Sequence, residues 1–199
     1  MFTLTKLRSG LRLLTVPRHD TKAITVFVFT KVGSRYETRS INGASHFIEH
    51  LMFKGTREIA PGEFSRTVAR NGGEDNAFTN WDYTAYYERI ARDRLELVMR
   101  MEADRMRNLR FTDETFASER NVIVEERRQR TDNSPGALLG ERMRAMLWPH
   151  HPYGTPVIGW LAGAPPVLLR KLPGLTLTPL SASEKTRAAL ALVAWLEST

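Results

Sequence analysis

The chain has 199 residues and a formal charge of +7, and its 42% hydrophobic and 26% charged residues are ordinary for a globular protein, so its composition suggests neither a disordered chain nor a membrane protein. Because it contains no cysteine, a disulfide framework, a thiolate nucleophile and a cysteine-based zinc site are all excluded. Its arginines alternate with glutamates over residues 88–130, as on exposed helix faces, so we expect no nucleic-acid partner despite the basic charge.

The beginning of the chain is expected to form antiparallel strands. Residues 3–16 alternate between apolar and polar around Ser9-Gly10, which predicts a hairpin, and residues 23–32 form a β-branched and aromatic strand. The first ten residues lack the basic and apolar series of a secretory signal, and no apolar run reaches the roughly 18 residues of a membrane span. We therefore expect a cytoplasmic protein without a membrane span, or a periplasmic one if the natural start lies elsewhere.

The middle of the chain alternates helical and strand patterns. Apolar residues recur at helical spacing over 47–52 until Gly55, and a second helix is expected from Pro61 to residues 71–73. The aromatic segment 76–90 predicts two strands joined by a short turn. Within it we expect packing roles for the aromatic residues Trp81, Tyr83, Tyr86 and Tyr87.

Three amphipathic helices are expected next, over residues 92–109, 112–132 and 135–148, and Thr112 is a suitable cap for the second. This order of elements predicts an α+β fold, a largely antiparallel sheet with helices packed on one face. The composition changes after Trp160: residues 161–180 are rich in proline and contain no acidic residue, and residues 181–199 have the pattern of one short helix.

The sequence His46-Phe47-Ile48-Glu49-His50 is the strongest chemical signal. Residues four apart lie on one face of a helix, so His46 and His50 can direct ring nitrogens at one metal ion. Glu49 lies beside them, where its carboxylate can accept a proton from a water molecule activated by the metal. The alternative is that both histidines are ordinary surface or core residues, but this needs a coincidence of three residue types at the right spacing. His150 and His151 lie in a proline-flanked loop, and we expect no metal there.

Catalytic zinc usually has three protein ligands and an open position, so a third ligand is required. The helix predicted over 112–132 offers Glu119, Glu125 and Glu126, of which the first and last lie two turns apart on nearly the same face. Spacing alone does not choose among them. All three could instead be solvent-facing partners of the neighbouring arginines.

Three strings in the same order, GASHFIEHLMFKGT, GGEDNAFTNWDYTAYY and ERNVIVEE, resemble the pitrilysin or insulinase superfamily of zinc metallopeptidases, nearest to bacterial proteases similar to mitochondrial processing peptidase. The resemblance covers residues 3–160. It implies a processing-peptidase-like domain with Zn²⁺ held by His46, His50 and Glu126, with Glu49 as general base. Glu119 is then a catalytic-site carboxylate that orients a ligand or the active-site water.

The same resemblance implies that Asn76, Ala77, Phe78 and Thr79 form an edge strand to which a peptide substrate adds as a further strand. It also implies a second homologous half, in the same chain or a partner subunit, that closes the catalytic chamber. We therefore expect a zinc-dependent endopeptidase unit in residues 1–160 and a divergent or truncated tail in residues 161–199. The alternative is a truncated, inactive fragment or a non-catalytic structural subunit of the same superfamily.

Overall fold

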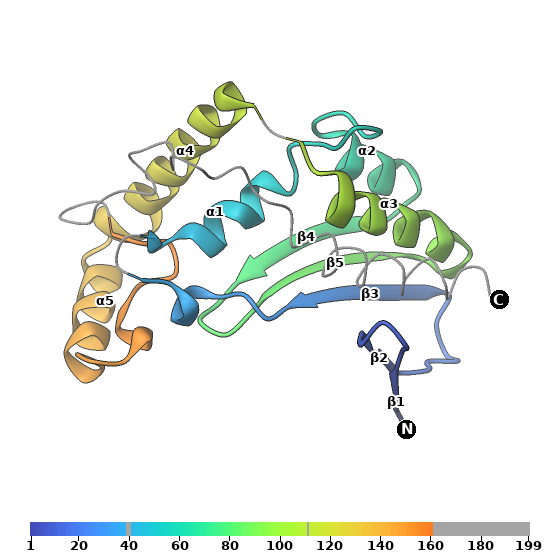
Figure 1. The fold of residues 1–199 in the computed structure, drawn as a ribbon, viewed down its shortest axis with the longest axis horizontal. Coiled ribbons are helices and arrows are strands. Elements are labelled where there is room, and N and C mark those ends of the chain that lie inside the picture. Colours follow the sequence, from blue (N-terminus) through green and yellow to red (C-terminus); the bar gives the residue numbers. More distant parts are fainter. Residues whose placement is uncertain (39–40, 111, 161–199) are drawn as a thin grey trace.

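The strands of the computed structural model, which describes residues 1–38, 41–110 and 112–160, form two antiparallel sheets (Figure 1). The first is the predicted hairpin, which turns at Gly10 with a φ of 91° that favours glycine. The second has three strands in the order β3-β5-β4. The strands are β1 (Thr3–Lys6), β2 (Arg12–Thr15), β3 (Ala23–Thr30), β4 (Glu74–Thr79) and β5 (Thr84–Ala91).

The helices follow the predicted positions closely. They are α1 (Ala44–Leu51), α2 (Glu63–Arg70), α3 (Leu95–Asn108), α4 (Asp113–Arg127) and α5 (Pro135–Leu147). Short turns of 3₁₀-helix lie at Ser34–Tyr36, Arg92–Arg94 and Pro152–Gly154. Thr112 caps α4 as expected, because its hydroxyl accepts a hydrogen bond of 3.2 Å from the Thr115 amide. The last predicted turn of α4 differs, since Arg128–Asp132 widens into a π-helical turn closed by the Asn133 amide on the Arg128 carbonyl.

The helices α1, α2 and α3 lie on one face of the three-stranded sheet, whereas α4 and α5 extend beyond its end (Figure 1). One apolar core, built on Phe64, Val68, Ile90, Val98 and Met101, joins α2 and α3 to the sheet. The predicted α+β class, with helices on one face of an antiparallel sheet, is therefore confirmed. The short helix expected over residues 181–199 lies outside the described residues.

A second core fixes α1 against α4. Phe47, Leu51 and Ile123 are each at most 2% exposed and pack together. Full burial of such a side chain contributes about 1.5–3 kcal/mol, so this contact is a large part of what holds the two helices together. Because Phe47 and Leu51 each follow a histidine, and Ile123 lies one turn before Glu126, the contact also sets the distance between the polar residues beside it.

A buried ionic cluster joins β5 to α3. It consists of Glu88, Glu102 and Arg105, each at most 1% exposed, and is called the Arg105 cluster below. Arg105 donates to Glu88 over 3.3 Å and to both oxygens of Glu102. The guanidinium also lies 4.2–5.1 Å from the ring centroids of three aromatic residues, Phe53, Phe64 and Tyr86.

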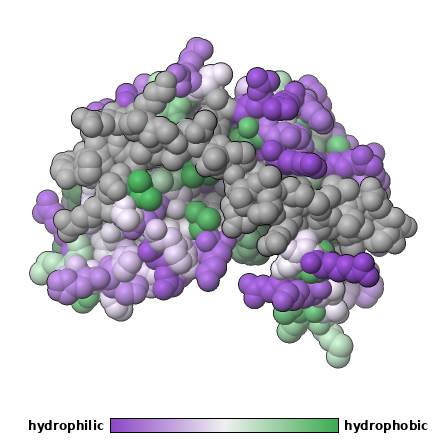
Figure 2. Space-filling view, in the orientation of Figure 1, coloured by the Kyte–Doolittle hydropathy of each residue, from purple (hydrophilic) through white to green (hydrophobic). Residues whose placement is uncertain are grey.

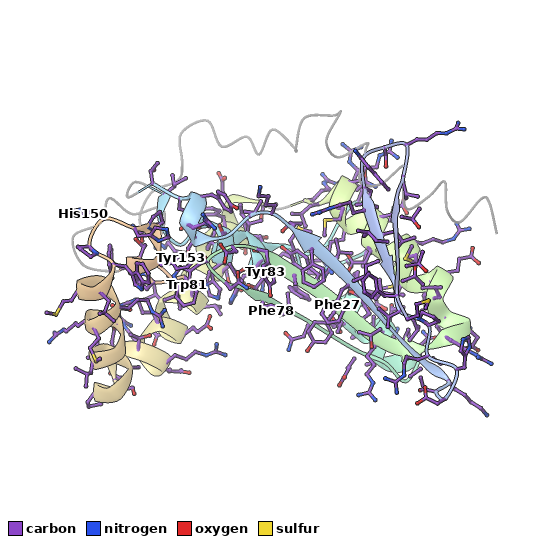
Figure 3. The ribbon with its side chains drawn as sticks, turned by 90° about the horizontal axis from the view of Figure 1, so that it is seen from below. Phe27, Phe78, Trp81, Tyr83, His150 and Tyr153 are labelled. Carbon is purple, nitrogen blue, oxygen red and sulfur yellow. The ribbon has the colours of Figure 1, made fainter. Side chains whose placement is uncertain are left out.

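The face of the three-stranded sheet that the helices leave open carries aromatic side chains, among them Phe27, Phe78 and Tyr83 (Figure 3). Phe27 is 47% and Phe78 39% exposed, whereas Tyr86, on the opposite face, is buried. Of the four aromatic residues expected to pack, Tyr86 is buried in the core, and Trp81, Tyr83 and Tyr87 are half-buried.

Polar side chains dominate the described surface in the view of Figure 2, with apolar atoms at the start of the chain beside the hairpin. No helix among the described residues combines the length and the apolar character that a membrane crossing requires.

Candidate metal centre

The packing of α1 on α4 brings His46, His50 and Glu126 together. One ligand atom from each lies within 4.8 Å of the other two. Glu126 Oε2 is 3.3 Å from His50 Nε2 and 3.6 Å from His46 Nε2. A tetrahedral zinc ion with bonds of about 2.0–2.1 Å separates its ligand atoms by roughly 3.3–3.4 Å. The three side chains, called the metal trio below, therefore fit a zinc ion in both chemistry and spacing.

Two observations on this trio favour a cation between its members. Glu126 Oε2 is buried and accepts no hydrogen bond from the described residues, although both imidazoles are close. Buried polar atoms are normally satisfied, so an unpaired carboxylate oxygen facing two ring nitrogens indicates a site built for a ligand. The other oxygen, Oε1, is held by Arg130 Nη1 at 3.0 Å, which fixes the direction of the carboxylate.

The pKa shifts of His46 and Glu126 suit metal binding, whereas the shift of His50 opposes it. Burial, together with the nearby His50, lowers the pKa of His46 to about 4, so His46 is neutral at physiological pH, as a metal ligand must be. Burial alone would lower the pKa of His50, but Glu126 and Glu119 outweigh it and raise that pKa. The proximity of His50 lowers the pKa of Glu126, so the carboxylate is ionised and able to bind a cation.

The three candidate glutamates of α4 have different surroundings. Glu119 Oε1 lies 2.9 Å from Nδ1 of His50, so the carboxylate can hold the ring with Nε2 directed at the metal trio. Lys54 Nζ in turn lies 2.5 Å from the other oxygen of Glu119, and this contact was not anticipated from the sequence. Glu125 is 56% exposed and pairs with Arg128. Packing thus gives the three residues different positions: Glu126 lies beside the imidazoles, Glu119 behind His50, and Glu125 largely in solvent.

Glu49 lies next to the metal trio but outside it. Its side chain is 8% exposed and accepts a hydrogen bond of 2.5 Å from the hydroxyl of Thr79 on β4. Burial raises the pKa of Glu49, which brings the carboxylate closer to the range useful for accepting a proton near neutral pH. The Thr79 contact also links α1 to the outer strand of the sheet.

Strand β4 runs beside these residues at the edge of the sheet. In the described part of the chain it pairs only with β5. The Ala77 amide donates to the side chain of its own neighbour, Asn76, over 2.8 Å, instead of to another strand. A groove of about 840 Å³ follows this edge and is lined by Asn76–Thr79, by His46, Glu49 and His50, and by the facing side of α4. An extended peptide could lie in this strand groove.

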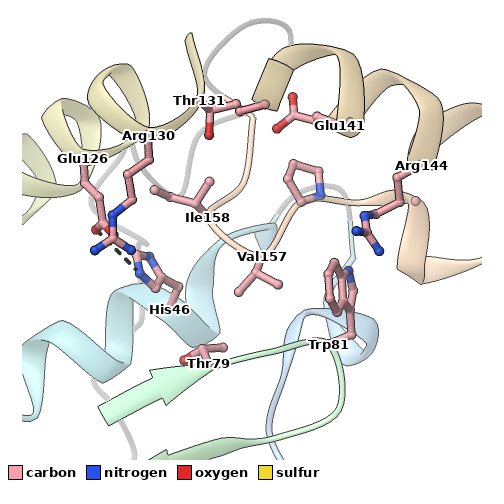
Figure 4. Close-up of a pocket in the computed structure, with 14 residues that line it drawn as sticks. His46, Thr79, Trp81, Glu126, Arg130, Thr131, Glu141, Arg144, Val157 and Ile158 are labelled. Carbon is pink, nitrogen blue, oxygen red and sulfur yellow. Dashed lines mark ion pairs between the residues drawn. The ribbon is translucent and has the colours of Figure 1, made fainter. Parts of the chain in front are cut away.

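A second cavity of about 410 Å³ lies on the α5 side of the metal trio (Figure 4). His46, Thr79, Glu126 and Arg130 line both spaces. The remaining walls of this α5 cavity come from Trp81, from Thr131, from α5 and from the loop 154–158. Sequence reasoning did not find it, because its residues come from five separate segments that only the tertiary fold brings together. Trp81, expected to be a packing residue, therefore also lines a cavity.

His150 and His151 lie outside the metal trio. His151 Nδ1 accepts a hydrogen bond of 3.2 Å from the Tyr153 amide, and its ring packs against Tyr153 and Trp148. These contacts give His151 a packing role in the loop after α5, where Figure 3 labels His150 and Tyr153.

Two helices that bring an inverted histidine motif and a distant glutamate to one half-buried point, beside an edge strand, define the class of inverted-motif zinc metallopeptidases. Residues 12–159 match the sequence pattern of the family described as insulinase, peptidase family M16. The match covers most of the chain, so the chain belongs to the insulinase family (peptidase family M16).

Individual relatives agree with this assignment. The chain is 40% identical over 156 residues to the zinc protease PqqE of Helicobacter pylori, which corresponds to 78% of this chain and 35% of that protein. The crystal structure of a protease from Helicobacter pylori matches with a TM-score of 0.77 and 38% identity, over 80% of this chain and 39% of the other. A peptidase M16 inactive domain from Pseudomonas fluorescens shares the fold at a TM-score of 0.74 and 16% identity, over 85% and 41% of the two chains.

The chain thus spans little more than a third of the length of the Helicobacter pylori relative. Since a domain described as inactive has the same fold, the fold alone does not decide whether a member is an enzyme. That question depends on the residues at the site.

Proposed function

We propose that residues 1–160 form the metal-binding unit of a zinc endopeptidase that hydrolyses extended peptides. In this proposal His46, His50 and Glu126 hold Zn²⁺, and Glu119 orients His50. Bound zinc supplies a Lewis acid that acidifies water and polarises a carbonyl group. The observation that supports the proposal most strongly is the approach of three ligand atoms, one from each of three half-buried side chains, to within 4.8 Å of one another.

Glu49 acts as the general base. Its buried carboxylate, held by the Thr79 hydroxyl, lies beside the metal trio and accepts the proton of the attacking water. The peptide lies in the strand groove along Asn76, Ala77, Phe78 and Thr79, and adds to the free edge of β4 through main-chain hydrogen bonds. Because main-chain contacts dominate such binding, the substrate is an unfolded segment and not a folded surface.

A second homologous half closes the site in this proposal. The strand groove and the α5 cavity are open spaces, and the relatives are more than twice as long as this chain. The part of those relatives that this chain does not cover is long enough for another domain of this size. The alternative is that this chain by itself is an inactive fragment that binds zinc without turnover.

The test is a matched pair of measurements on the purified chain, zinc content and cleavage of an unstructured peptide with and without chelator. Glu49→Gln should retain one zinc per chain and lose about 10²–10⁴-fold in turnover, the usual contribution of general base catalysis. The control is Glu114→Gln, because Glu114 is an exposed glutamate of α4 that lines neither the strand groove nor the α5 cavity.

Hydrolysis that survives the chelator or the Glu49→Gln change would contradict the proposal. One zinc per chain without hydrolysis in the unaltered protein would favour the inactive fragment. In that case, addition of a partner half should restore cleavage.

A further inference from the structure

The α5 cavity has a definite charge arrangement. Two of its acidic residues are already neutralised, Glu126 by Arg130 at 3.0 Å and Glu141 by Arg127 through bonds of 2.8 and 3.0 Å. Arg144 also lines the cavity but pairs with no acidic side chain among the described residues. The charged walls therefore leave one cation without an anionic partner, at the end of the cavity away from the metal trio (Figure 4).

Arg144 is positioned by an aromatic platform. Its guanidinium carbon lies 4.3 Å from the centroid of the Trp81 ring. Trp81 is itself anchored, because its Nε1 donates to the Thr155 carbonyl over 3.0 Å. Stacking on a fixed ring leaves the guanidinium edge free to donate hydrogen bonds, and orders it before a ligand arrives.

The cavity has a suitable shape for a side chain with an apolar stem. Small residues on one face of α5, Ala137 and Gly140, leave space, and Pro156, Val157 and Ile158 supply an apolar floor. These α5 positions and Arg144 recur at three- and four-residue spacing, so they share one face of the helix. A volume of about 410 Å³ lies within the roughly 300–1,000 Å³ typical of small-ligand sites.

We propose that the α5 cavity binds a carboxylate of the peptide substrate, with Arg144 as the specificity-determining residue. This inference rests on the proposed function, because it assigns a substrate class to the same site. The peptide backbone follows β4 and passes the metal trio, and one residue beyond the scissile bond turns into the α5 cavity. The carboxylate is either a Glu or Asp side chain or the C-terminus of the peptide, and both present the planar pair of oxygens that a guanidinium recognises.

Binding to the zinc-loaded Glu49→Gln chain tests this without requiring hydrolysis. The probes are fluorescent, unstructured neutral peptides with one Glu, Gln or Lys moved along the sequence, each with a free or an amidated C-terminus. At one position Glu should bind about three- to fivefold more tightly than Gln, as expected for a partly exposed ion pair, and Lys should bind most weakly. A preference lost on amidation would identify the C-terminal carboxylate as the ligand.

Arg144→Gln should remove the preference, and Arg144→Glu should reverse it in favour of Lys, which a folding defect cannot produce. The matched control is Arg142→Gln, an exposed arginine on the same helix that does not line the cavity. Equal binding of the Glu, Gln and Lys peptides, no binding of any peptide, or a preference that survives Arg144→Gln would each overturn the inference. Absence of hydrolysis by the chain with Glu49 intact would count against the proposed function alone, because the binding preference is measured separately.

Discussion

The metal trio and the Arg105 cluster are both groups of ionisable side chains shielded from solvent, the first partly and the second completely, but they are built in different ways. In the Arg105 cluster a guanidinium donates to two carboxylates and is surrounded by three aromatic rings. In the metal trio Arg130 holds one oxygen of Glu126, the other oxygen accepts no hydrogen bond from the described residues, and two open spaces adjoin the three side chains. The Arg105 cluster also contains buried polar atoms without a hydrogen-bond partner among the described residues, Glu88 Oε2 and Arg105 Nη1, so the adjoining open space is the better sign of a functional site.

Removal of the Arg105 side chain should cause the largest loss of stability, because the Arg105 cluster is fully buried. Arg105→Met leaves two carboxylates in a dry core, and loss of one partner of a buried ion pair costs about 3–5 kcal/mol. Urea unfolding should show this loss, whereas Arg107→Met, at an exposed position on α3, should change stability by less than about 0.5 kcal/mol. An equally small effect at Arg105 would show that the cluster is not the structural element described above.

The metal trio should respond in the opposite sense, with a loss of metal affinity and little loss of stability. Glu126→Gln removes one of the three proposed ligands, so zinc affinity should fall by more than the roughly 10–100-fold that an outer partner of a ligand contributes. Competition with a chelator measures this, with Glu114→Gln as the control. Unchanged affinity would mean that Glu126 is not the third ligand.

The contact between Lys54 and Glu119 should have an effect intermediate between those of Arg105 and Glu126. It is partly exposed, but Glu119 also contacts His50, a proposed zinc ligand. Lys54→Met should leave the carboxylate behind His50 without its cation and lower zinc affinity by about tenfold. Lys54→Arg should restore most of the loss, and the exposed Lys31→Met should have no effect on zinc. If Lys54→Met reduced stability without altering zinc affinity, the lysine would be structural only.

The difference between the two clusters also explains what the sequence could predict. The histidines are four apart, so the period of the helix alone puts them on one face. Glu119 and Glu126 share nearly one face of α4, and local spacing cannot choose between them. The choice depends on which turn of α4 lies against α1, and that is determined by the contact of Ile123 with Phe47 and Leu51, more than 70 residues apart in the chain.

The Arg105 cluster was not predicted at all. Glu102 and Arg105 are three apart on a helix rich in charge, a pattern that ordinarily marks an exposed ion pair. Their burial depends on Glu88 in β5 and on three aromatic residues, one in β5, one in α2 and one in the turn after α1. Likewise Arg144 has the sequence context of a solvent-facing residue, and only the position of Trp81 relates it to a cavity.

Glu88 should make the free energy of unfolding depend on pH, and per unit of pH this is the smallest effect expected. Burial and the neighbouring Glu102 raise the pKa of Glu88 to about 10. In the unfolded chain this carboxyl ionises near pH 4.5, so between pH 4.5 and about 10 the folded chain retains a proton that the unfolded chain has released. The stability contribution is therefore complete below pH 4.5 and declines as the pH rises, by at most about 1.4 kcal/mol per unit. Glu88→Gln mimics the protonated form and removes this decline.

Urea unfolding at pH 5, 6.5 and 8 should therefore show Glu88→Gln gaining stability over the unaltered protein as the pH increases. Glu96→Gln is the control, because Glu96 is exposed and pairs with Arg100 one turn away. A constant difference between Glu88→Gln and the unaltered protein would mean that Glu88 is ionised in the fold, in which case Arg105 would face two anionic carboxylates. The closed cluster would then carry a net negative charge, as the metal trio does, and the contrast between the two sites would rest only on the cavities beside the latter.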